Sequence, residues 1–100
     1  MEDLAISDTT ILARATEVIA TEVDGEAVVM NIERGQCYGF DAIGTRIWTS
    51  LERPMRVGEL CAVLLGEYDV DAETCRRDVS RLLGELVRER LVTISNEEPR

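Results

Sequence analysis

The sequence contains no histidine and no lysine, and aromatic residues make up only 4% of it. Without histidine the most common general base of enzymes is missing, and a cysteine or serine nucleophile lacks its usual activator. No glycine-rich phosphate loop follows a predicted strand and opens a helix. These absences argue against catalysis, and we predict that the chain is not an enzyme.

Cysteine is scarce as well. Cys37, Cys61 and Cys75 are widely spaced, and no two cysteines form a C-x-x-C pair. A zinc site needs closely spaced sets of cysteine and histidine, so we predict no metal site and no cofactor. The three cysteines are expected to be free and to behave as small apolar residues, which is how reduced cysteine usually packs.

Long apolar runs are missing too. The longest, Ala27–Met30 and Leu60–Leu65, fall far short of the roughly 18 residues that a membrane-spanning helix needs. The first residues are acidic, whereas a secretory signal begins with basic residues before an apolar run. We therefore expect a cytoplasmic protein that has no membrane partner.

Positive charge is in short supply. The chain has 20 acidic residues against 11 arginines, for a net charge of −9. Proteins that hold DNA place cations against phosphates, and a chain this acidic would repel a duplex over most of its surface. We predict no nucleic-acid partner. A winged-helix DNA-binding regulator is kept as a less favoured alternative.

What the sequence does contain is a clear pattern of strands. Residues 16–23 are rich in β-branched side chains and are followed by Asp24-Gly25, a strong two-residue hairpin turn. Residues 26–32 alternate as a second strand, Gly35 suits a second turn, and residues 37–40 form a short third strand. Residues 1–15 show no clear period, so we expect a flexible N-terminal arm of partial order at best, and residues 96–100 are expected to be a frayed tail.

Helical periodicity begins after the third strand. Asp41 is a suitable N-cap for a helix that Pro54 ends, a second helix should run from about Val57 to Tyr68, and a third and longer one begins after Asp71. Residues 91–94 either add a last short strand or pack on the sheet. The pattern predicts an α+β fold of the winged-helix sort, in which one domain over residues 16–95 has a three-stranded antiparallel sheet followed by three helices.

The third strand is the most promising binding element. A three-stranded meander has an edge, and an edge presents unpaired amide and carbonyl groups that an extended peptide satisfies by adding a strand. Pockets between that edge and a neighbouring helix would then give specificity. The alternative is a short edge that is covered by a loop and binds nothing.

An ordered set of residues resembles one known family. It comprises the segment Val29–Asp41 with Gly44, Ile47, Trp48 and Leu51, then Val57, Glu59, Leu60, Leu64, Leu65, Tyr68–Asp71, Asp78, Val79, Leu82, Leu83, Leu86, Leu91 and Val92. In this order, over roughly residues 14–95, the set resembles the PqqD-like family. The resemblance implies a recognition element for ribosomally synthesised, post-translationally modified peptides, which binds the leader of the precursor as an added antiparallel strand.

Carried onto this chain, the resemblance implies backbone pairing by Gln36, Cys37, Tyr38 and Gly39. The other implied peptide-binding residues are Arg34 at the entrance of the strand, Phe40, and from the third helix Cys75, Asp78, Val79, Arg81 and Leu82. Several of these, Tyr38, Phe40 and Val79 among them, have core packing as the alternative role.

The resemblance also implies partners. We favour a stand-alone protein of lasso peptide biosynthesis, which hands the precursor to a leader protease or another modifying enzyme of the same pathway. The alternative within the family is a chaperone that delivers a precursor to a radical enzyme. A structural subunit that only joins two enzymes is a third possibility.

Overall fold

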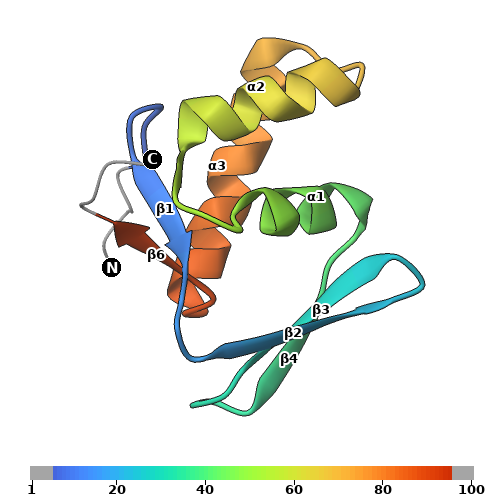
Figure 1. Cartoon of the computed structure of the whole chain (residues 1–100). Helices are drawn as coiled ribbons and strands as arrows, with labels where there is room; N and C mark the ends of the chain where they lie inside the picture. The colour runs from blue at the N-terminus through green and yellow to red at the C-terminus, as the bar shows by residue number, and fades with distance from the viewer. Residues whose placement is uncertain (1–5, 96–100) are drawn as a thin grey trace.

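Two small antiparallel sheets and three helices make up the fold of the computed structural model, which describes residues 6–95 (Figure 1). The elements are β1 Ile11–Arg14, β2 Val18–Val23, β3 Glu26–Asn31, β4 Gln36–Gly39, α1 Ala42–Ser50, β5 Met55–Arg56, α2 Val57–Glu67, α3 Ala72–Arg88 and β6 Val92–Ser95. The predicted α+β class, with a three-stranded meander followed by three helices, is confirmed.

The meander sheet has the strand order β2, β3, β4. Asp24 and Gly25 both have positive φ values, 55° and 83°, as the tight turn between β2 and β3 requires. Ala27, Val29 and Asn31 on β3 are buried, so this face of the strand packs against the helices. The hairpin therefore forms where the sequence predicts it, and its alternation decides which face becomes core.

The second sheet, of order β5, β1, β6, was not predicted. Residues 11–14 pair with residues 92–95 on one side, and Ile11 and Leu12 pair with Arg56 and Met55 on the other. The expected flexible arm over residues 1–15 is therefore corrected: β1 belongs to the fold, and Leu12 is completely buried. Residues 1–5 of that arm, and the expected frayed tail over residues 96–100, lie outside the described residues.

Side chains of both sheets and all three helices meet in one core. Its largest fully buried members are Leu12, Ile47, Leu51, Leu60, Leu83, Leu91, Val29, Val57, Val92 and Asn31. The Arg14 guanidinium stacks over the Trp48 ring of α1, with 4.5 Å between Cζ of Arg14 and the ring centroid. The guanidinium also donates a hydrogen bond to the Trp48 backbone carbonyl oxygen at 2.6 Å. Burial lowers the pKa of Arg14. This contact fastens β1 to α1.

The second helix begins at Val57 although Arg56 occupies its N-cap position. The Glu59 carboxylate accepts a hydrogen bond from the Arg56 amide at 3.1 Å, and the amides of Val57 and Gly58 donate to the carbonyl oxygens of Thr10 and Asp8. The segment before β1 thus satisfies amides that a helix start otherwise leaves unpaired. In residues 6–95 no helix is long and apolar enough to cross a membrane.

The carboxylate of Asp71 caps the third helix by accepting from the Thr74 amide at 2.8 Å. The Thr74 hydroxyl also donates to this carboxylate, at 3.0 Å. The hydrogen bond from the Thr74 backbone amide, followed by the one from its hydroxyl, holds the pKa of Asp71 below its ordinary value. Because the pKa of Asp71 is lowered in the folded state, its ionised carboxylate stabilises the fold at pH values above the ordinary aspartate pKa. This stabilisation is lost as the pH falls through the lowered pKa. Asp71→Ala should therefore lower the melting temperature by a few degrees at pH 7, with a difference from wild type that shrinks in strong acid.

The matched control is Asp69→Ala, because Asp69 is an exposed aspartate two residues away that caps no helix. Thermal unfolding followed by circular dichroism at several pH values measures both. Equal melting temperatures for Asp71→Ala and Asp69→Ala at pH 7 would contradict the capping role.

Candidate functional site

Strand β4 is an open edge of the meander sheet, since β3 is its only partner among the described strands. The Phe40 amide donates to the Ala27 carbonyl oxygen at 2.9 Å, which makes Phe40 and Ala27 a hydrogen-bonded pair. Such pairs alternate along an antiparallel ladder, so Tyr38 and Gln36 also bond to β3. The amides and carbonyls of Cys37 and Gly39 therefore point away from β3, toward the open side.

This alternation narrows the predicted pairing. Four residues were expected to offer backbone groups to the peptide. The backbone groups of Gln36 and Tyr38 are already hydrogen-bonded to Asn31 and Val29 of β3. Cys37 and Gly39 keep theirs available, and both residues are exposed. A guest strand would thus meet two amides and two carbonyls on β4.

A cavity of about 370 Å³ adjoins the far end of β4. Its walls come from the end of β4, from α1 and from α3, and it is lined by Gly39, Phe40, Asp41, Ile43, Gly44, Ile47, Asp78, Val79, Arg81 and Leu82. Six predicted residues therefore meet here: Gly39, Phe40, Asp78, Val79, Arg81 and Leu82. The lining combines apolar side chains with charged ones, and the side chains of Asp78 and Arg81 are exposed and lie 3.9 Å apart.

A polar cluster lies at the other end of β4. The Tyr38 hydroxyl donates to Oε1 of Glu89 at 2.6 Å and lies 2.8 Å from Oε1 of Gln36, while Arg34 pairs with the same Glu89 oxygen at 3.1 Å. The Glu89 hydrogen bond, first among several causes, raises the pKa of Tyr38. This hydrogen bond holds β4 to the end of α3.

Asn31 fixes the turn that leads into β4, a role that the sequence analysis missed. Its side-chain nitrogen Nδ2 donates to the carbonyl oxygens of Arg90 at 3.0 Å and Glu89 at 3.4 Å, and its side-chain oxygen Oδ1 accepts from the Arg34 backbone amide at 2.9 Å. It is only 2% exposed. The sequence did carry a signal for this role, since Asn31 is a polar residue on the same strand face as Ala27 and Val29. A side-chain amide buried on such a face needs hydrogen-bond partners.

Cys75 does not line the cavity in the described structure. It is buried in the packing between α2 and α3, a turn nearer the helix start than Val79, and it contacts Cys61. The pKa of the Cys61 thiol is raised to about 11, mainly because the thiol is buried and secondly because it lies against Cys75. The predicted binding role of Cys75 is corrected to core packing, because α2 covers that end of α3. As predicted, the two thiols are free and buried, whereas Cys37 is exposed.

Comparison with known proteins places this geometry in a family. A family model described as coenzyme PQQ synthesis protein D (PqqD) matches residues 26–92, more than half of the chain. The chain belongs to the PqqD family. The resemblance noted in the sequence is thereby confirmed. No curated protein sequence matches the chain.

Three solved structures resemble this PqqD family member. TbiB1, solved in complex with the TbiA(beta) leader peptide, is 30% identical with a TM-score of 0.76, over 86% of this chain and 98% of TbiB1. The PqqD part of PqqCD from Methylobacterium extorquens, a stand-alone recognition element solved by NMR, has 18% identity and a TM-score of 0.75, over 92% of this chain and 98% of its own. Lasso peptide synthetase B1, complexed with the leader peptide, has 17% identity and a TM-score of 0.73, over 81% and 95%. At these lower identities the last two show the shared fold alone.

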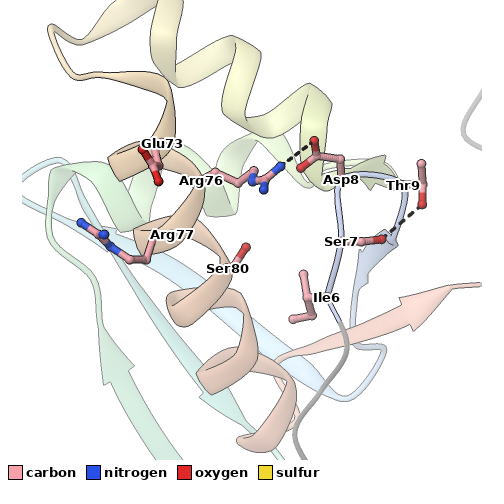
Figure 2. A pocket seen from close by; sticks show the side chains of 8 residues that line it. All are labelled: Ile6, Ser7, Asp8, Thr9, Glu73, Arg76, Arg77 and Ser80. Carbon is pink, nitrogen blue, oxygen red and sulfur yellow. Dashed lines mark hydrogen bonds and ion pairs between the residues drawn. The ribbon is translucent and has the colours of Figure 1, made fainter.

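A second pocket of this PqqD family member, of about 640 Å³, lies away from the β4 cavity (Figure 2). It lies between the segment before β1 and the face of α3 that carries Arg76, Arg77 and Ser80, opposite the face that lines the β4 cavity. Asp8 pairs there with Arg76 at 3.1 Å. Its two arginines are balanced by two acids, so the pocket has no net charge to select a ligand. Within residues 6–95 no group of His, Cys, Asp or Glu side chains could hold a metal ion.

Proposed function

We propose that this chain binds the leader of a ribosomally made precursor peptide as an added antiparallel strand along β4. The observation that carries the proposal is the row of outward-facing amides and carbonyls of Cys37 and Gly39 beside a cavity with both apolar and charged lining residues. Backbone pairing holds an extended peptide whatever its sequence, and side-chain pockets add specificity. The 30% identical TbiB1, which was solved with a leader peptide, supports the proposal.

Each wall of the groove has a role in this proposal. Phe40, Val79 and Leu82 receive an apolar side chain of the leader, because they are apolar residues that line the cavity. Asp78 and Arg81 make polar contacts at its rim. Their mutual ion pair is exposed, and exposed pairs contribute little, so both side chains can turn to the peptide at small cost. Gln36, Tyr38 and Arg34 form the polar end of the groove.

The chain acts without catalysis in this proposal. It presents the bound leader to a leader protease or another modifying enzyme, in the cytosol where ribosomal precursors are made. We favour lasso peptide biosynthesis, since lasso peptide synthetase B1, solved with a leader peptide, shares the fold of this chain. Delivery of a precursor to a radical enzyme is the alternative, and the enzyme encoded beside the chain distinguishes the two.

Amide hydrogen exchange tests the strand addition directly. In the free protein the Cys37 and Gly39 amides should exchange fast, because they point to solvent. Saturation with a synthetic leader should slow these two by about tenfold or more, with a much smaller change at Gln36 and Tyr38. NMR of the labelled protein resolves the four amides. A leader that binds while the Cys37 and Gly39 amides exchange as before would refute pairing on β4.

A further inference from the structure

The outer face of the meander sheet is apolar and uncovered. Alternation from the buried positions of β3 places on it the side chains of Ile19, Thr21, Val23, Val28, Met30, Ile32 and Cys37. Ile19 is 55% exposed, Val23 56% and Ile32 47%. The described helices all lie on the other side of this sheet (Figure 1). Contiguous apolar surface of this kind marks an interaction site more often than isolated exposed residues do.

The rows of this face run directly into the peptide edge. Ile19 is opposite Met30, and Met30 is opposite Cys37; likewise Thr21 is opposite Val28, which is opposite Gly39. Anything that covers the outer face therefore reaches β4 and a strand bound to it.

Charge around the face decides what can cover it. Residues 16–33 carry five acidic residues and no arginine. Two of the acids flank the apolar rows at their ends, since Glu26 is opposite Val23 and the Glu17 carbonyl accepts from the Ile32 amide at 3.0 Å. A second copy of this face would bring like charges together, which is costly. A nucleic acid or an anionic membrane would be repelled for the same reason.

We infer that the outer face docks the modifying enzyme that receives the leader, through an apolar patch on that enzyme surrounded by arginine or lysine. This inference rests on the proposed function. The peptide edge and the docking face share strands, so the enzyme is held beside the peptide that it acts on, and the high local concentration speeds its transfer.

The test uses the purified leader-processing enzyme encoded beside this chain, with binding measured by calorimetry in the presence of saturating leader. Ile19→Asp should weaken enzyme binding by about tenfold or more, because it puts a charge in the apolar centre. Ile94→Asp is the matched control, an isoleucine 45% exposed on β6, and should bind as wild type does. Replacing both Glu17 and Glu26 by arginine should weaken binding and remove its dependence on salt.

Leader titration separates the two proposals. Ile19→Asp should bind leader as wild type does, since its side chain points away from the groove. If wild type binds leader but not the enzyme, or if Ile19→Asp and Ile94→Asp bind the enzyme equally, the docking face is wrong and the leader site stands. If wild type does not bind leader, the proposed function itself fails. Self-association of wild type that Ile19→Asp abolishes would make the face a dimer interface and would also overturn the inference.

Discussion

Gly39→Pro should weaken leader binding by about tenfold or more relative to Gly39→Ala. The proline ring removes an amide that faces the open side of β4, and it crowds the path of an added strand. The protein should still fold, because an edge strand tolerates proline where its amide faces outward. Titration of each variant with the same synthetic leader measures the effect.

Gly39→Ala is a fair control for this experiment. A Cβ at position 39 meets no heavy atom within 4 Å, and Gly39 is not one of the glycines with positive φ. Cys37→Pro, compared with Cys37→Ala, repeats the test at the other outward amide. Tyr38→Pro should instead disturb the sheet itself, since its amide bonds to β3. If Gly39→Pro and Cys37→Pro both keep wild-type affinity, the leader does not pair with β4.

Leu83→Ala should cost about 2–5 kcal/mol of unfolding free energy, the range for a leucine truncated in a packed core. Leu83 is completely buried among residues of both sheets and the helices. A domain of this size is marginally stable, at roughly 5–15 kcal/mol, so the loss is a large share of the total. Urea denaturation measures it. Leu65→Ala is the control, because that side chain is 37% exposed on α2 and should cost far less.

The neighbouring Leu82 separates stability from binding. It is only partly buried and lines the cavity beside β4. Leu82→Ala should therefore lower leader affinity with a smaller loss of stability than Leu83→Ala, and folded Leu83→Ala should keep its affinity. Equal effects of the two variants on both measurements would mean that the cavity does not receive a leader side chain.

The meander and the three helices were predictable because their signals are local. Asp24-Gly25 sets the hairpin, and the caps Asp41 and Asp71 each stand just before a helical period. The sheet of β5, β1 and β6 was not predictable in this way. Its strands have two to four residues, and the partners of Ile11 lie at positions 56 and 95. Four residues carry no period that distinguishes a strand from a loop, and pairing over such distances leaves no local mark.

The binding site shows a similar division. The residues of β4 and α3 were found through the family resemblance, and the structure brings most of them to one groove. Which amides face outward depends on the register of β3 and β4, and the sequence alone does not fix that register. Cys75 was misplaced because a helical stripe says which residues face inward, not which neighbouring helix covers each turn.

Pairing of β1 with β6 joins residues 11–14 to residues 92–95. During synthesis the meander emerges from the ribosome as a run of neighbouring segments and is free to form early, whereas β1 must wait for a partner made about 80 residues later. Until then β5 can pair with one side of β1, but the side that faces β6 has no partner. A premature stop codon before Val92 would thus leave an otherwise complete groove on a chain in which one edge of β1 stays unpaired, and such a product should aggregate.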